Sequence, residues 1–142
     1  MLATNDNLIE LKKRVGQAFA SLRRQGYVAK RGFMCCQSCA CAEAASIVEK
    51  MPNTERSKLQ GFVYYHKQDQ DRIKLRQRKP WTTAYEFGGL NIRFGEVYVG
   101  DDVYGKQAYK IGQDVAVALA RAGLQVEWDM DPDRTINVVG LL

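Results

Sequence analysis

The chain has 142 residues, and its formal net charge at pH 7 is +5. This length suffices for one domain with a single core, so we expect one domain over residues 1–142. The N-terminus lacks the basic and apolar regions of a secretory signal, and no later run approaches the roughly 20 apolar residues of a membrane span. These features predict a cytoplasmic protein outside the membrane, and the positive charge permits an anionic partner.

Two amphipathic helices are predicted in the first third of the chain. Residues 7–25 have apolar side chains at helical spacing, and Gly26 is placed to end the helix. After a short connection through Tyr27, a second helix begins within or just after the cysteine segment 35–41. Pro52 prevents this helix from continuing.

Three further segments in the middle of the chain have the composition of strands. Residues 61–66 form an aromatic and β-branched run that predicts a buried strand. Residues 72–78 alternate between basic and apolar side chains, which suits a strand with one basic face but also a short helix. Residues 90–94 follow two glycines and alternate clearly, so they predict another strand.

The last third of the chain predicts a helix followed by an antiparallel hairpin. Residues 105–122 have a helical apolar stripe, and Gly123 is placed to end it. Residues 124–128 and 135–139 alternate as two strands joined by a turn. Helices and strands thus mix without regular alternation, which predicts an α+β fold with an antiparallel or mixed sheet packed against about three helices.

All four cysteines stand within seven residues, in the run Cys35-Cys36-Gln37-Ser38-Cys39-Ala40-Cys41. In a reducing cytosol such a cluster is better explained by free thiols, metal ligands or a redox pair than by structural disulfides. Simple packing of small apolar side chains is a third explanation. Packing is the interpretation that we apply to Cys41, because it shares a helical stripe with Ala44 and Val48.

Zinc is one expected occupant of the cluster. The spacing Cys36-x-x-Cys39 lets two thiolates reach one tetrahedral ion, and the only histidine, His66, is a further candidate ligand. The fourth ligand would come from Cys35, Cys41 or a carboxylate such as Asp69. The hypothesis therefore assigns a metal site to Cys36, Cys39 and His66.

Thiol chemistry is the alternative use of the same residues. A cysteine at a helix start has its thiolate stabilised by backbone amides, and a partner three residues later can resolve a mixed disulfide. Ser38 is a suitable N-cap for such a helix. Cys35, Cys36 and Cys39 are then the reactive candidates, and a nucleophilic enzyme would pair Cys36 or Cys39 with His66.

The basic segment between residues 72 and 81 suggests a third function, nucleic-acid binding. It combines positive charge for phosphates with aromatic faces for stacking. A solvated basic face is the competing interpretation, since no recognised nucleic-acid motif occurs in the sequence. The candidate residues are Arg72, Lys74, Arg76, Arg78, Lys79 and Trp81.

Several short motifs together resemble a bacterial family of small proteins known only as a domain of unknown function. The most distinctive are the adjacent cysteines before Gln-Ser-Cys and the later His-x-Gln-Asp. The matching segments are residues 32–39, 64–69, 88–90, 94–95, 123–129 and 134–136. The resemblance implies no established activity, and the segment 72–81 looks longer and more basic than this family pattern.

Together these patterns predict a small cytoplasmic binding or regulatory module rather than an enzyme. The cysteine segment and His66 form its predicted functional centre, with zinc as the expected cofactor. We expect a protein partner, and nucleic acid is the second partner class that the sequence allows.

Overall fold

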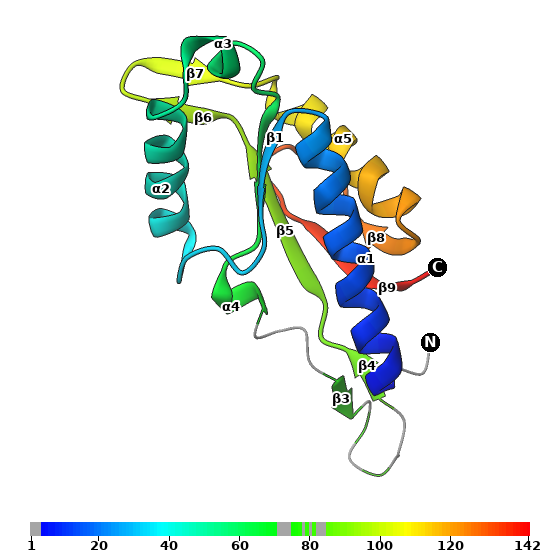
Figure 1. Ribbon diagram of the computed structural model, residues 1–142. Coiled ribbons are helices and arrows are strands. Elements are labelled where there is room, and N and C mark those ends of the chain that lie inside the picture. The colour runs from blue at the N-terminus through cyan, green and yellow to red at the C-terminus, as the bar shows by residue number, and fades with distance from the viewer. Residues whose placement is uncertain (1–3, 71–74, 78, 80, 82–84) are drawn as a thin grey trace.

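A five-stranded sheet in the order β1-β2-β5-β9-β8 forms the centre of the protein (Figure 1). The computed structural model describes residues 4–70, 75–77, 79, 81 and 85–142. The strands of this sheet are β1 (Tyr27–Lys30), β2 (Gly61–Tyr64), β5 (Leu90–Gly95), β8 (Leu124–Glu127) and β9 (Ile136–Leu141). β1 and β2 run parallel and the other neighbours are antiparallel, so the sheet is mixed.

Three longer helices accompany the sheet, as the sequence predicts, and the fold class is α+β. They are α1 (Asn5–Arg24), α2 (Gln37–Glu49) and α5 (Ala108–Arg121), and the four-residue helices are α3 (Asn53–Arg56) and α4 (Lys67–Gln70). α1 begins earlier than expected because Thr4 is its N-cap and forms a reciprocal capping box with Asn7. Within the described residues, no helix has both the length and the apolar composition that crossing a membrane requires.

Two small antiparallel hairpins complete the fold. One joins β3 (Leu75–Gln77) to β4 (Tyr85–Phe87), and the other joins β6 (Val97–Val99) to β7 (Asp102–Tyr104). β3 falls within the predicted segment 72–78, whose remaining residues lie outside the described part of the chain. The predicted hairpin near the C-terminus is confirmed, because β8 and β9 pair antiparallel.

Helices cover both faces of the sheet where β1 and β2 lie (Figure 1). Successive side chains of a strand point to opposite faces. Accordingly, Val63 joins the larger apolar cluster with α1 and α5, whereas Phe62 and Tyr64 join a smaller cluster with α2. α2 therefore packs on the face of the sheet opposite the main core.

β1 corrects the expectation that the residues after the first helix are only a connection. Tyr27, Val28 and Ala29 are buried, and β1 pairs with β2 in register from Tyr27 with Gly61 onward. Strands that pair in parallel need a crossover between them, and here the crossover contains α2. This topology brings the cysteine segment, which follows β1, to the same end of the sheet as the residues that follow β2.

Candidate functional site

The cysteine segment is tied to the end of β2 by backbone hydrogen bonds. The amide of Phe33 donates to the carbonyl of Tyr65 over 2.8 Å, and the amide of Lys67 donates to the carbonyl of Met34 over 3.0 Å. Met34 has φ = 62°, a left-handed conformation that reverses the chain just before the cysteines. These contacts fix the point from which the cysteine segment enters α2.

Three of the four thiols meet at the start of α2. The helix begins at Gln37 with Cys36 as its N-cap, so the prediction that it starts within the cysteine segment is confirmed, while Ser38 lies inside the helix. The Sγ atom of Cys35 is 3.7 Å from that of Cys36 and 3.6 Å from that of Cys39. All three sulfur atoms lie within 4.8 Å of one another. We call this group the thiol cluster.

Neighbouring groups shift the pKa values of two thiols in the cluster in opposite directions. The hydroxyl of Ser38, followed by the backbone amide and thiol of Cys39 and the thiol of Cys35, lowers the pKa of Cys36 to about 6. The thiols of Cys35 and then Cys36 raise the pKa of Cys39 to about 11. Cys36 is therefore the group that becomes a thiolate first, at the position where the helix presents its free amides.

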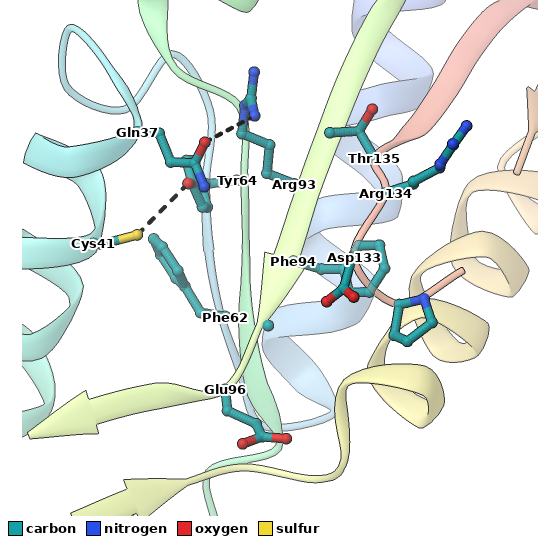
Figure 2. Close-up of a pocket in the computed structure, with 12 residues that line it drawn as sticks. Gln37, Cys41, Phe62, Tyr64, Arg93, Phe94, Glu96, Asp133, Arg134 and Thr135 are labelled. Carbon is teal, nitrogen blue, oxygen red and sulfur yellow. Dashed lines mark hydrogen bonds between the residues drawn. The ribbon is translucent and has the colours of Figure 1, made fainter. Parts of the chain in front are cut away.

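Cys41 corrects the prediction of a core cysteine. It is exposed, and the buried residues of α2 are Ala40, Ala44 and Val48, so Cys41 lies one position away from the buried stripe. Its Sγ atom is 3.9 Å from the hydroxyl oxygen of Tyr64. Cys41 lines a cavity of about 190 Å³ (Figure 2), and it is not a member of the thiol cluster.

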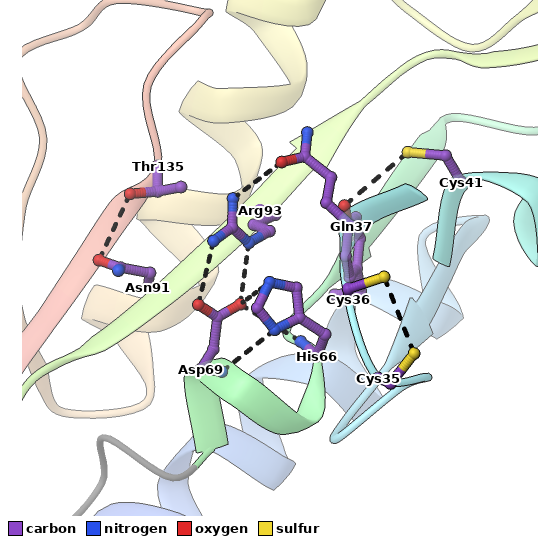
Figure 3. Close-up of polar contacts among 10 residues, drawn as sticks. Cys35, Cys36, Gln37, Cys41, His66, Asp69, Asn91, Arg93 and Thr135 are labelled. Atoms are coloured by element: carbon purple, nitrogen blue, oxygen red, sulfur yellow. Dashed lines mark hydrogen bonds and ion pairs between the residues drawn. The ribbon is translucent and has the colours of Figure 1, made fainter. Parts of the chain in front are cut away.

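His66 belongs to a different constellation from the thiol cluster. It is 4% exposed, and its Nδ1 accepts a hydrogen bond from the amide of Asp69 over 3.1 Å. Its Nε2 lies 3.3 Å from Oδ2 of Asp69. Both ring nitrogens therefore face Asp69 (Figure 3). Among the described residues, the only group of three or more metal-ligating atoms within 4.8 Å of one another is the thiol cluster, which His66 does not join.

Asp69 also holds Arg93 in a two-pronged ion pair. Nε of Arg93 lies 2.9 Å from Oδ2 of Asp69, and its NH2 nitrogen lies 3.1 Å from Oδ1. The side chain of Asp69 is 3% exposed and that of Arg93 is 24% exposed. The hydrogen bonds that Asp69 accepts raise the pKa of Arg93 against the opposing effect of burial. Asp69 thus fixes the orientation of a guanidinium at the protein surface.

Arg93 connects this ion pair to the start of α2. Its NH1 nitrogen donates to Oε1 of Gln37 over 3.2 Å (Figure 3). Sequence reasoning assigned Arg93 only to the second face of its strand and missed its role here. Its partner Asp69 is 24 positions away, and the available signal was the one charged residue in this strand.

The basic segment remains a prediction for nucleic-acid binding. Arg72, Lys74 and Arg78 lie outside the described residues, and Arg76 is placed in β3 by its backbone alone. Lys79 and Trp81 are both exposed, and Nζ of Lys79 lies 5.8 Å from the centre of the Trp81 ring. This distance is within the range of a cation–π contact.

Comparison with known proteins identifies a family for this chain. No curated protein and no solved structure gives a significant match. A family model covers residues 12–141, and its description is "Domain of unknown function (DUF6891)". The match spans the sheet, the thiol cluster and the Asp69–Arg93 ion pair. The chain therefore belongs to the DUF6891 family, as the motifs around the cysteines and His66 predict.

Proposed function

We propose that this protein is a small metal-binding module in which Cys35, Cys36 and Cys39 hold zinc. The convergence of three thiols carries the proposal. Four ligands placed tetrahedrally at about 2.3 Å from zinc stand about 3.8 Å apart. The separations of 3.6 and 3.7 Å from Cys35 to the other two sulfur atoms are close to that edge length. The thiol cluster therefore needs little rearrangement to hold the ion.

The acidity of Cys36 supports the same proposal. Zinc binds thiolates, so a ligand with a pKa of about 6 is already deprotonated at neutral pH. Cys35 is exposed and the other two thiols are half-buried, so the fourth ligand position faces solvent. Water or a side chain of a protein partner would complete the site. His66 is left out of this ligand set because both of its ring nitrogens already face Asp69.

The test is zinc binding by the purified, tag-free protein, measured by elemental analysis and by competition with a chromophoric chelator. We expect about one zinc per chain, and replacing any of Cys35, Cys36 or Cys39 with serine should weaken binding at least about tenfold. The matched control is Cys41→Ser, which removes a thiol of the same helix outside the cluster and should leave the affinity unchanged.

Two outcomes would reject this ligand set. The first is zinc content below about a tenth of an equivalent after incubation with the metal. The second is loss of zinc in a folded His66→Gln variant, with folding checked by circular dichroism. That result would restore His66 to the ligand set.

A second candidate function, thiol–disulfide exchange, is supported by the order of the two pKa values. Cys36, with a pKa of about 6, is suited to attack, and Cys39, with a pKa of about 11, is suited to stay protonated until resolution. The Cys36 thiolate would attack one sulfur of a substrate disulfide and release one substrate thiolate. Deprotonated Cys39 would then attack the mixed disulfide, release the second substrate thiol and leave a Cys36–Cys39 disulfide.

The experiment for exchange uses zinc-free protein and a chromogenic aromatic disulfide. The wild-type thiol cluster should release two aromatic thiolates rapidly, whereas Cys39→Ser should release one and remain as the mixed disulfide. Reaction at the cluster no faster than at Cys41 would exclude this function. Zinc should suppress the reaction if the same thiols hold the ion.

A further inference from the structure

A second concavity lies between α1 and the end of β1, and it is lined almost entirely by cations. Its volume is about 480 Å³. Its lining residues are Lys12, Arg23, Lys30, Arg31, Tyr65 and Gln70. Of these six described residues, four are positively charged and none is acidic. We call this feature the basic cavity; Figure 1 shows α1 and β1, two of the elements that contribute residues to it, side by side.

The four cations of the basic cavity are not neutralised by the acidic residues that the structure describes. Ion pairs elsewhere in the protein join Arg14 to Glu10 and Lys106 to Asp114, but no described carboxylate lies within ion-pair distance of the cavity cations. Gathering like charges is unfavourable, and a concave wall concentrates their field. Such an arrangement stabilises a multiply charged anion that enters the cavity.

Arg23 is held in place from the side of β1. Its Nε donates to the carbonyl oxygen of Ala29 over 2.9 Å, so the side chain bridges α1 and the strand. This bond uses one of the five N–H donors of the guanidinium. Arg23 lines the cavity, and a guanidinium fixed through Nε loses less conformational entropy when it binds.

Arg31 is placed against α1 by a glycine. A Cβ atom on Gly16 would stand 2.7 Å from NH1 of Arg31, so the absence of a side chain at Gly16 makes room for the guanidinium. Burial raises the pKa of Tyr65, and the charge of Arg31 acts in the opposite direction, which places this charge near the phenol. Arg31 therefore lies over both α1 and Tyr65, at the rim of the cavity.

We propose that the basic cavity binds a small anion carrying two or more phosphate groups. Guanidinium groups match the geometry of phosphate oxygens, and four cations suit a ligand with several negative charges. The volume of about 480 Å³ falls within the range of small-molecule sites. The basic cavity uses none of the cysteines, so this inference is independent of the thiol cluster.

The chain offers a matched pair of variants on α1. Lys12 and Arg23 line the cavity, whereas their sequence neighbours Lys13 and Arg24 are exposed and do not. The double variants Lys12→Gln/Arg23→Gln and Lys13→Gln/Arg24→Gln therefore lose the same charge from the same helix. Inorganic tripolyphosphate is the probe, and isothermal titration calorimetry at two salt concentrations is the measurement.

We expect one tripolyphosphate per chain, at least about tenfold weaker binding in the cavity double variant, and a change within about twofold in the control. Because Arg23→Gln also removes the bond to Ala29, the exposed Lys30→Gln variant is measured beside it and should weaken binding as well. If both double variants weaken tripolyphosphate binding equally, net charge alone explains the effect and the proposal is overturned.

A second arm of the experiment separates small phosphates from nucleic acid. The same proteins are titrated with a single-stranded oligonucleotide of mixed sequence. Binding of the oligonucleotide without binding of tripolyphosphate would reassign the surface to nucleic acid and overturn the proposal. So would the absence of tripolyphosphate binding at millimolar concentration, whereas a preference for tripolyphosphate that depends on Lys12, Arg23 and Lys30 would support it.

Discussion

Cys36 stands at the one position of α2 where a thiolate meets free backbone amides. The first four amides of a helix have no partner inside it, so the N-cap side chain experiences a positive potential. Ser38 and Cys39 lie within the first turn and add a hydroxyl and a thiol to the same place. The acidity of Cys36 thus follows first from the Ser38 hydroxyl and then from the amide and thiol of Cys39.

Alkylation should reveal this acidity directly. The rate of iodoacetamide labelling at Cys36 follows its thiolate fraction, so it should rise as the pH passes through about 6 and level off near neutral pH. Peptide mass spectrometry assigns the labelled cysteine. Cys41→Ser should leave this profile unchanged, and a midpoint near the ordinary thiol value of 9.0 would contradict the assignment.

Asp69 is the buried charge that the Arg93 guanidinium stabilises. The substitution Asp69→Asn keeps the size of the side chain but removes its charge and one of its two acceptor oxygens, so Arg93 loses the ion pair and one hydrogen bond. We expect the free energy of unfolding in urea to fall by about 2 kcal/mol. The exposed control Asp133→Asn should change it by less than about 0.5 kcal/mol, and a similarly small effect at Asp69 would contradict the role of the ion pair.

At the scale of elements, local patterns predict α1, α5 and the hairpin of β8 and β9 well. Each helix combines a clear period with a following glycine, and the two strands alternate on either side of a polar turn. β1 is too short for its alternation to stand out, and only its pairing with β2 makes it a strand. The candidate site was likewise predicted only where it depends on residues close together in the chain. The sequence names Cys35, Cys36 and Cys39 together as reactive candidates because they are close in the chain, but the pairing of His66 with Asp69 depends on how the chain turns at α4.

Replacing two helical glycines with alanine should change the stability of the protein in different directions. A Cβ on Gly112 of α5 would stand 2.5 Å from the ring of Trp128 and 2.9 Å from that of Phe94, two packed aromatic rings. Gly112→Ala should therefore destabilise the protein by about 1–3 kcal/mol. A Cβ on Gly16 of α1 meets only the flexible end of Arg31, so Gly16→Ala should be neutral or stabilise the helix by up to about 1 kcal/mol.

Thermal unfolding followed by circular dichroism compares the two variants. The Gly112→Ala protein should have the lower midpoint. If both variants shift in the same direction by the same amount, the close approach of the aromatic rings to α5 is not what constrains Gly112.

Across the whole molecule, the thiol cluster lies on the less extensively packed face of the sheet. α1 and α5 share the larger apolar cluster with most of the strands, whereas α2 contributes Ala40, Ala44 and Val48 to the smaller one. Burial of fewer large side chains lowers the free energy needed to open a region locally. α2 should therefore open more readily than the rest of the fold.

Hydrogen exchange measured by mass spectrometry tests this order. Amides of α2 should exchange faster than those of α1 and α5, and zinc should slow exchange selectively in α2, because a ligand stabilises the state to which it binds. The Cys36→Ser variant is the control in which zinc should have no effect. Equal exchange rates in the three helices would contradict the claim that the smaller apolar cluster stabilises α2 less than the larger cluster stabilises α1 and α5.

The bond from Arg23 to Ala29 also bears on how the sheet avoids association with other chains. β1 is one end of the five-stranded sheet, and an edge strand offers its backbone groups to strands of other molecules. Arg23 occupies the carbonyl of Ala29, and the exposed charge of Lys30 follows at the end of the strand. The same cations that shape the basic cavity therefore protect this edge against strand addition and aggregation.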